Sequence, residues 1–305
     1  MLGQKHPPTL AIIADIHGNI PALEATLADL EHVQPDHVVI AGDIVNRGPQ
    51  SHLAAQRVAA LGFPTISGNH DTWLAKLARG GEKPEGWETT RWTPERRATE
   101  ELTPDDLDWL DALAPSLRVA LPGAEPLLVV HGSPRHNREG MGRLISDERL
   151  AGALAGVEER TIVGAHIHYP WERWLGDQHV IVIGAVGVPF NGDTNAQYGL
   201  FRWEDGLWRF EHRSIPYDHA PLFEAWRASG YLDDGSISSE LMMLEHQTAR
   251  TQYVPFVEWV MEEGASYDRE SLARFREWRV MVPPPPWPVP GLVIPDRAQA
   301  SEAGD

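Results

Sequence analysis

Short apolar runs alternate with helical patterns in the first seventy residues, and this alternation constrains the fold more than any other feature. The runs cover residues 9–14, 37–41 and 64–67. The first two are continuously apolar, which is typical of strands buried on both faces. A helix opening at Pro21 is predicted after the first run, and a second helix over residues 51–61 after the second run. This β-α-β-α-β order predicts a parallel sheet with helices outside it.

The remaining residues continue the strand pattern after a helical insertion and end in a helical extension. Thr93-Pro94 and Thr103-Pro104 predict two helix starts inside the insertion, because each pairs an N-cap residue with a first-turn proline. Asp205-Gly206 predicts the turn of a late hairpin. Further strands are predicted over residues 127–130, 161–163, 179–183, 198–203 and 207–213.

These patterns divide the chain into three parts. We expect a catalytic domain over residues 1–217, with the helical insertion at about 72–115. A helical extension packed on it is expected over 218–282, followed by a Pro-rich and polar tail over 283–305. The proline run favours an extended conformation, which we interpret as a strap or linker rather than a ligand for a proline-reading domain.

Composition excludes several classes of function. The 305 residues include 26 basic and 44 acidic side chains, and the resulting charge of −18 makes nucleic acid an unlikely partner. The absence of cysteine excludes disulfides and thiolate metal sites. No uncharged run is long enough to cross a membrane, and the first residues lack a leader pattern, so we expect a cytoplasmic protein with no membrane association.

Five short polar blocks follow predicted strands, and together they predict a metal site. The carboxyl ends of strands in an open α/β sheet meet at one edge, so these blocks should converge there. Imidazole, carboxylate and amide ligands suit Mn²⁺, Fe or Zn²⁺, and seven of them suit two ions that share a carboxylate. The candidate ligands are Asp15, His17, Asp43, Asn69, His131, His166 and His168, with His70 nearby.

Each block alone has an ordinary structural interpretation. Asp15-x-His17 can be structural, Gly42-Asp43 can be a turn, and His166 and His168 can be core or solvated histidines. The ordered set carries the prediction, because chance would have to place all five blocks at strand ends.

In their order, the blocks DIH, GDIV, GNHD, HGS and GAHIH resemble the signature of the calcineurin-like metallophosphoesterases. The resemblance covers about residues 9–215. The last block departs from the family pattern at Ala165, which moves Gly164 one residue away from His166 but leaves the spacing of His166 and His168 intact.

The resemblance implies a four-layer α-β-β-α sandwich of two mixed sheets flanked by helices, and a dinuclear metal site. Asp43 would bridge two divalent ions, with Mn²⁺ expected and Fe, Zn²⁺ or Ni²⁺ as alternatives. Asp43 and His70 would be catalytic, and Arg47, Asn69 and His70 would contact the substrate phosphate. One ion would be held by Asp15, His17, Asp43 and His168, and the other by Asp43, Asn69, His131 and His166.

Two branches of the family are suggested by different residues. DIHGN followed by PALEATL is similar to the smaller bacterial and archaeal phosphodiesterase-type branch. Arg47 in GDIVNRGP instead resembles the GDxVDRG block of serine/threonine protein phosphatases and symmetrical dinucleoside tetraphosphatases, whose arginine holds phosphate. Asn46 stands where that block has its second aspartate. The alternative role for Arg47 is a surface salt bridge.

We therefore expect a metal-dependent hydrolase that cleaves a small phosphate diester or monoester by in-line attack of a metal-bridging hydroxide. The alternatives are a protein phosphatase or symmetrical dinucleoside tetraphosphatase, and a non-catalytic scaffold on the same fold. The substrate could be nucleotide-like, and a homo-oligomer remains open. Trp73, Trp87, Trp92 and Trp109 could stack on a base, but we interpret them as the small core of the insertion.

Overall fold

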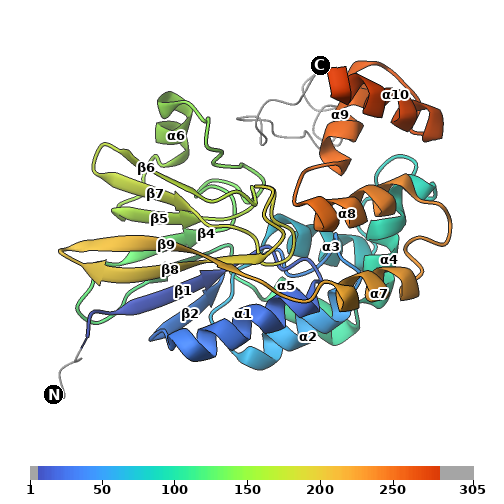
Figure 1. The fold of residues 1–305 in the computed structure, drawn as a ribbon. Coiled ribbons are helices and arrows are strands. Elements are labelled where there is room, and N and C mark those ends of the chain that lie inside the picture. The colour runs from blue at the N-terminus through green and yellow to red at the C-terminus, as the bar shows by residue number, and fades with distance from the viewer. Residues whose placement is uncertain (1–5, 282–305) are drawn as a thin grey trace.

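The computed structural model describes residues 6–281, which form two β-sheets flanked by helices (Figure 1). One sheet has the strand order β2-β1-β8-β9, and the other has the order β3-β4-β5-β7-β6. The strands of the first sheet are β1 (Thr9–Ile13), β2 (His37–Ile40), β8 (Ala196–Glu204) and β9 (Leu207–Ile215). Those of the second are β3 (Ser116–Val119), β4 (Leu127–Val130), β5 (Thr161–Gly164), β6 (Trp171–Leu175) and β7 (Gln178–Val182).

Both sheets are mixed. β1 pairs in parallel with β2 and antiparallel with β8, while β4, β5 and β7 run parallel between the antiparallel β3 and β6. The sandwich of two mixed sheets with outer helices is therefore confirmed, whereas a single parallel sheet, as the first three runs alone would suggest, is not what forms.

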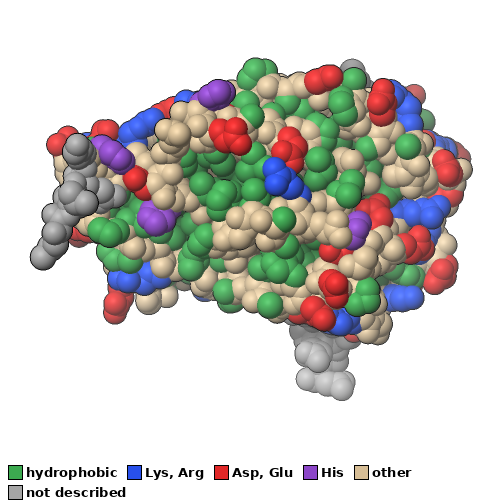
Figure 2. All heavy atoms as spheres, turned by 90° about the horizontal axis from the view of Figure 1, so that it is seen from below, with side chains coloured by type: hydrophobic (Ala, Val, Ile, Leu, Met, Phe, Trp, Pro, Cys, Tyr) green, Lys and Arg blue, Asp and Glu red, His purple; other side chains and the backbone are tan. Residues whose placement is uncertain are grey.

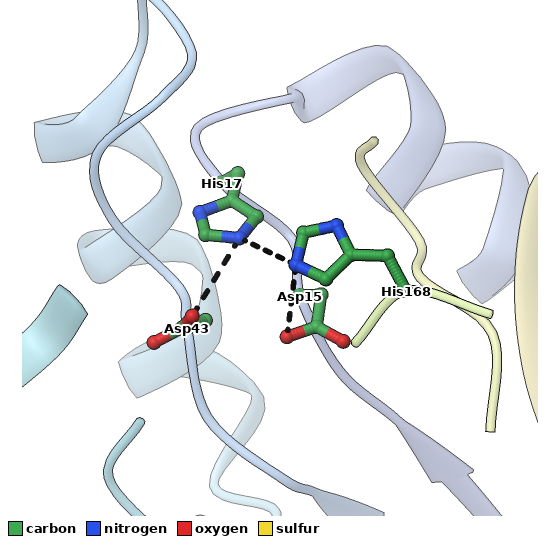
Figure 3. Close-up of side chains that lie close together, drawn as sticks. All are labelled: Asp15, His17, Asp43 and His168. Atoms are coloured by element: carbon green, nitrogen blue, oxygen red, sulfur yellow. Dashed lines mark hydrogen bonds and ion pairs between the residues drawn. The ribbon is translucent and has the colours of Figure 1, made fainter. Parts of the chain in front are cut away.

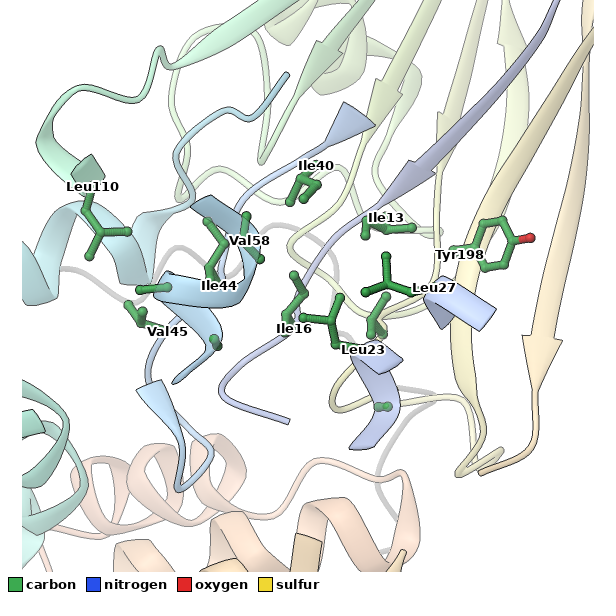
Figure 4. Packing of buried hydrophobic residues seen from close by; sticks show 14 of the residues in the cluster. Ile13, Ile16, Leu23, Leu27, Ile40, Ile44, Val45, Val58, Leu110 and Tyr198 are labelled. Carbon is green, nitrogen blue, oxygen red and sulfur yellow. The ribbon is translucent and has the colours of Figure 1, made fainter. Parts of the chain in front are cut away.

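Strand β1 is apolar throughout because hydrophobic clusters cover both of its faces. Leu10 and Ile12 point into the cluster between the two sheets. Ala11 and Ile13 point to the other face, where they pack in a cluster with helix α1 (Ile20–Val33) and helix α2 (Ser51–Leu61) (Figure 4). The side chains alternate between faces with the period of two that a strand imposes.

Helix α1 begins as its sequence predicts. The Asn19 side chain accepts a hydrogen bond from Ala22 N at 3.1 Å, and Pro21 lies in the first turn, where its missing N–H has no helical partner to lose. On the outer face of the other sheet, helix α6 (Asp147–Ala153) contributes Leu150 to a third cluster. The sequence pattern did not predict α6.

The insertion contains α3 (Asn69–Ala78), a 3-10 turn (Thr90–Trp92), α4 (Thr93–Glu101) and α5 (Pro104–Asp111). Thr103 caps α5 as predicted, and its side chain accepts from Asp106 N. Thr93 is different: it lies inside α4 because the 3-10 turn precedes it, and Trp92 occupies the cap position.

The predicted strand over residues 64–67 is wrong as a full strand. Only isolated bridges form there, between Ile40 and Thr65 and between Ile66 and Ala114. Pro64 has no N–H to extend a ladder, and the chain enters α3 at Asn69. Strands β3 and β6 were not predicted, since each is only four or five residues long and carries exposed polar side chains.

Four helices follow β9: α7 (Ala220–Ala228), α8 (Ile237–Thr248), α9 (Tyr253–Glu262) and α10 (Arg269–Met281). Of these, α8 lies against the 3-10 turn and α4 of the insertion (Figure 1). Ser236 and Ser238 donate hydrogen bonds to the carbonyl oxygens of Thr90 and Arg91, which ties the start of α8 to the 3-10 turn. The Pro-rich tail over 283–305 lies outside the described residues.

Seen from below, the molecule carries hydrophobic side chains among polar ones, and charged side chains gather toward the end formed by the insertion and the C-terminal helices (Figure 2). No helix in residues 6–281 is both long and apolar enough to span a bilayer.

Leu23→Ala tests the packing of α1 on the first sheet. Leu23 is fully buried in the cluster drawn in Figure 4, so its truncation should lower the free energy of unfolding by about 2–5 kcal/mol in urea denaturation. Leu53→Ala, on α2, is the matched control, because Leu53 is 48% exposed and should change stability by less than about 0.5 kcal/mol. Equal effects of the two changes would contradict this packing.

Candidate metal centre

The structure brings all seven predicted ligand side chains together at the carboxyl ends of the strands. Asp15 and His17 follow β1, and Asp43 follows β2. His131 follows β4, Asn69 begins α3, and the two remaining histidines, His166 and His168, follow β5. The loops that carry them converge in the centre of the molecule, as four of the side chains illustrate (Figure 3).

Asp15, His17, Asp43 and His168 form one half of this cluster. Their ligand atoms lie within 4.8 Å of one another, and all four side chains are buried. His17 Nε2 is 3.6 Å from Asp43 Oδ2 and 3.3 Å from His168 Nε2 (Figure 3). Two ring nitrogens that face each other in this way are well placed to present their lone pairs to one cation.

Asp43, His131 and His166 form the other half, again with ligand atoms within 4.8 Å of one another. His131 Nε2 is 3.2 Å from Asp43 Oδ2 and 3.0 Å from Asn69 Oδ1. Asp43 belongs to both halves, so its carboxylate is the group in position to bridge two ions.

Backbone carbonyls orient three of the imidazoles. Because a carbonyl only accepts, each Nδ1 that contacts one carries a proton, and each Nε2 faces the cluster. Nδ1 lies 3.3 Å from Val45 O in His17, 2.9 Å from Ala41 O in His131 and 2.6 Å from Val188 O in His168.

Two carboxylate oxygens in the centre need a positive partner. Asp15 Oδ1 and Asp43 Oδ2 are buried and make no hydrogen bond with any of residues 6–281. An unpaired buried carboxylate oxygen is unfavourable, and a divalent cation held also by imidazole and amide groups would satisfy it. The donor set therefore fits metal ions.

Burial and nearby charges also shift the pKa values of the side chains in the centre. Burial raises the pKa of Asp15 to about 8, and the Asp43 charge adds to this effect. Although burial opposes charge on both groups, mutual attraction raises the pKa of His131 to about 9 and holds that of Asp43 well below its usual range. Burial lowers the pKa of His166 to about 3, which leaves this imidazole neutral. Cation binding should therefore release protons from Asp15 and His131.

The ligand loops adopt an unusual backbone conformation. Ten non-glycine residues in the described part of the chain have positive φ, and seven of them belong to these loops. Each such residue costs about 1–3 kcal/mol, and such strain persists only where the surrounding structure holds it in place. The seven are Asp15, His17, Asp43, Asn46, Arg47, His166 and His168.

Glycine is required where two of the loops touch. Gly42 has a φ of 84°, and a Cβ on Gly68 would lie 2.1 Å from Asp43 Oδ1 and 2.3 Å from Asp43 N. Only a residue without a side chain lets the chain before α3 approach Asp43 this closely.

His70 lies at the edge of the centre and is held by Asn46. His70 N donates to Asp43 Oδ1 at 2.8 Å, and His70 Nδ1 is 2.8 Å from Asn46 Nδ2. Asn46 Oδ1 accepts from Arg47 N, so the amide turns its NH₂ toward His70. The amide donates to the imidazole here, whereas an aspartate at this position would accept from it.

Arg47 is buried and paired with the C-terminal extension. Its Nη2 donates to Glu245 on α8, and its guanidinium carbon lies 5.6 Å from the centroid of the Phe190 ring. Phe190 in turn stacks on His168, with ring centroids 4.5 Å apart. The salt bridge that the sequence left open thus exists, but it lies inside the protein.

The tryptophans of the insertion take different positions. Trp73 contacts His70 edge-on with ring centroids 6.3 Å apart, and Trp92 contacts Trp73 at 6.0 Å. Trp87 is buried, and Trp109 packs against the main hydrophobic cluster rather than in a separate small core of the insertion. Trp73 is therefore the tryptophan of the four that touches a predicted catalytic side chain.

Asp71 has a role that the sequence did not predict. Its two carboxylate oxygens accept from four backbone N–H groups, those of Asp43 and Gly68 at 2.8 Å, Ile44 at 2.8 Å and Val45 at 3.2 Å. This carboxylate fixes the loop that carries Asp43. The available signal was an acidic residue in the first turn of a helix, where it can bond to free N–H groups.

The architecture and the cluster together define a metal-binding α/β protein, and comparison with known proteins identifies its family. A family model described as calcineurin-like phosphoesterase matches residues 8–170, more than half of the chain. The chain belongs to this family.

Two curated relatives match different portions of the chain. A symmetrical bis(5'-nucleosyl)-tetraphosphatase of Paracidovorax citrulli is 37% identical over 130 residues, which are 40% of this chain and 43% of that protein. The chain thus matches less than half the length of this relative. An uncharacterized protein of Methanocaldococcus jannaschii is 25% identical over 231 residues, or 70% of this chain and 90% of that protein.

Solved structures share the fold. A metallophosphoesterase from Sphaerobacter thermophilus superimposes with a TM-score of 0.62 at 21% identity, covering 80% of this chain and 99% of that chain. A hypothetical protein from Pyrococcus horikoshii does so with a TM-score of 0.60 at 20% identity, covering 74% and 95%.

Asp71→Asn tests the support of the Asp43 loop. The amide NH₂ would face backbone donors, so the free energy of unfolding of metal-free protein should fall by about 1–3 kcal/mol. Calorimetric Mn²⁺ affinity should fall about ten- to a hundredfold. Asp108→Asn is the control, since Asp108 is 75% exposed in a surface pair with Arg79 and should change neither quantity appreciably. Unchanged metal affinity in Asp71→Asn would show that the loop does not depend on this carboxylate.

Proposed function

We propose that this chain is a dinuclear-metal phosphoesterase that hydrolyses a small, nucleotide-like phosphate ester. The observation that carries the proposal is the shared Asp43 carboxylate between two groups of buried ligands, in a chain of the calcineurin-like phosphoesterase family. One ion would be held by Asp15, His17, Asp43 and His168, and the second by Asp43, Asn69, His131 and His166. Mn²⁺ is our proposed metal, because the donors are nitrogen and oxygen only.

When bound, the two ions would lower the pKa of a coordinated water and neutralise charge on the phosphoryl oxygens. The chain's own residues would then orient the ester. Arg47 carries a delocalised charge that the Phe190 ring separates from His168, and we assign it to a phosphoryl oxygen. Asn69, at the start of α3, would contact the same group.

His70 is the proposed acid on the leaving-group side. Burial lowers its pKa to about 4, so the imidazole is neutral near pH 7. Since Asn46 donates to Nδ1, the single proton of the ring lies on Nε2. A neutral imidazole with its proton there can donate a hydrogen bond to the departing oxygen.

A symmetrical dinucleoside tetraphosphatase is the second candidate, favoured by Arg47 and by the similarity to the tetraphosphatase of Paracidovorax citrulli. A nucleobase could then lie near Trp73, beside His70. The scaffold alternative is less favoured, because every proposed ligand position still carries a side chain able to bind metal and these side chains converge.

Asp43→Asn and His131→Ala test the dinuclear centre. Each should reduce hydrolysis by at least about a thousandfold, because Asp43 belongs to both groups of ligands and His131 lies next to both Asp43 and Asp15. The assay compares bis-p-nitrophenyl phosphate, p-nitrophenyl phosphate and diadenosine tetraphosphate after metal removal and Mn²⁺ addition. His37→Ala, at an exposed histidine of β2, is the matched control and should retain wild-type turnover.

The compound that the protein hydrolyses decides between the two candidate functions. Metal-dependent cleavage of the diester supports the phosphodiesterase, and selective cleavage of diadenosine tetraphosphate supports the second candidate. Near wild-type turnover in either Asp43→Asn or His131→Ala would contradict the assignment of a dinuclear centre.

His70→Ala separates an acid from a structural residue. If His70 assists the leaving group, the variant should lose about 10²–10⁴-fold in kcat on an alkyl phosphate ester, which has a poor leaving group. The loss on a p-nitrophenyl ester should be much smaller, because that leaving group needs little protonation. The measurement is kcat for the two esters with Mn²⁺ at saturating concentration. An equal loss of kcat on both esters would show that His70 does not assist the leaving group.

A further inference from the structure

Glu245 is a fully buried carboxylate on α8, outside the residues that the family model matches. The same face of α8 also buries Leu241, Met242 and His246. An ionised carboxylate among such side chains is strongly unfavourable unless it is paired and hydrogen-bonded. Its position therefore calls for specific partners.

The two oxygens of Glu245 have different partners. Oε1 accepts from Gln252 N at 2.8 Å and from Tyr253 N at 3.0 Å, where the chain enters α9. Oε2 accepts from Arg47 Nη2. The carboxylate is thus anchored to the α8–α9 junction through one oxygen and holds a guanidinium with the other.

Arg47 is equally constrained on its own side. Its backbone is left-handed, with φ of 63°, and its guanidinium lies over Phe190, the ring that stacks on His168. Arg47 Nε is buried and has no hydrogen-bond partner among residues 6–281. A donor of the guanidinium thus remains unused although Glu245 occupies Nη2.

Arg47 is linked to the metal centre on two sides. Asn46, the residue before it, contacts His70, with Nδ2 of the amide 2.8 Å from Nδ1 of the ring. On the other side, the Phe190 ring lies between the guanidinium and His168. The guanidinium therefore lies next to the groups that surround the proposed phosphoryl position.

We propose that Glu245 is a positioning residue, which holds the Arg47 guanidinium in the orientation that binds the phosphoryl group of the substrate. This inference rests on the phosphoesterase function proposed above and deepens it. It makes α8 of the C-terminal extension part of the proposed phosphate-binding site, although the seven ligands come from elsewhere in the chain.

The geometry favours positioning over competition for Arg47. A guanidinium has five N–H donors in a rigid fork, so one carboxylate oxygen on Nη2 leaves donors for a phosphoryl oxygen. A side chain held by a fixed carboxylate on one side and an aromatic ring on the other does not have to be ordered when phosphate binds.

Glu245→Gln is the main test, with Glu240→Gln as the matched control. The amide can replace only one of the two oxygens, so its NH₂ must face either Arg47 or the Gln252 and Tyr253 N–H groups. Glu240 lies on the same helix and also pairs with an arginine, Arg269, but at the surface. The readouts are binding of inorganic phosphate to the Mn²⁺-loaded full chain by calorimetry, and KM and kcat for the best ester.

For Glu245→Gln, phosphate affinity should fall and KM should rise by about ten- to a hundredfold, with kcat and Mn²⁺ affinity changed less than about threefold. Glu240→Gln should match the wild type. In an Arg47→Ala background, adding Glu245→Gln should have no further effect on phosphate affinity, because the carboxylate acts through the guanidinium.

Two results would overturn the inference. Unchanged phosphate affinity in a folded Glu245→Gln variant would remove the positioning role, and tighter binding would show that Glu245 competes with phosphate for Arg47. If Glu245→Gln does not fold, the decision passes to Glu245→Asp, which keeps the charge but withdraws it by one methylene and should weaken phosphate binding in the same direction.

The outcome also separates this inference from the proposed function. A wild-type chain whose phosphate binding depends on Glu245, but which hydrolyses no ester with any metal, would refute the phosphoesterase function and leave the positioning role standing. Hydrolysis that is insensitive to both Glu245 variants would support the phosphoesterase function and refute the positioning role. A wild-type chain that binds no phosphate would overturn the positioning role itself.

Discussion

Two buried carboxyl groups, Asp15 and Asp43, are the constraint on which the rest of the structure depends. They follow neighbouring parallel strands, β1 and β2, whose register pairs Ile13 with Ile40 just before the two loops. Burial opposes ionisation of both groups, and attraction to His131 favours it. The Asp43 charge adds to the effect of burial on Asp15. The apolar clusters on both faces of β1 hold the two groups together in spite of this burial.

The same constraint accounts for the strained loops. Five of the seven ligands have a left-handed backbone and lie within four residues of a strand end, where such a residue turns the chain sharply. The strain is distributed over loops that begin at hydrogen-bonded strands and are tied by further contacts. Asp71, with four backbone donors, ties the Asp43 loop, and Asn19 Nδ2 donates to Gly187 O across the centre.

The sequence predicted those parts of the molecule whose cause is local. The run at 9–14 is apolar because β1 is covered on both sides, and the polar blocks stand out because they interrupt such runs at their ends. β6 was not predicted, because Glu172 and Arg173 interrupt the apolar pattern of this edge strand. Local pattern could not reveal that Glu245 meets Arg47, since 198 residues separate them and nothing in either segment specifies where α8 packs.

Asn46 fits a centre that already holds two buried acids. An aspartate at position 46 would place a third carboxylate next to His70, whose backbone N–H donates to Asp43. This carboxylate would stabilise the protonated form of His70, and the site would then hold one more charge with little solvent around it. The amide avoids that charge: its oxygen accepts from Arg47 N, and its NH₂ donates to His70 Nδ1. The adjacent Arg47 then needs a negative partner from elsewhere, and Glu245 supplies one from α8. The amide at position 46 and the distant glutamate are thus two parts of one electrostatic arrangement, in which the negative partner of Arg47 lies on α8 and not beside His70.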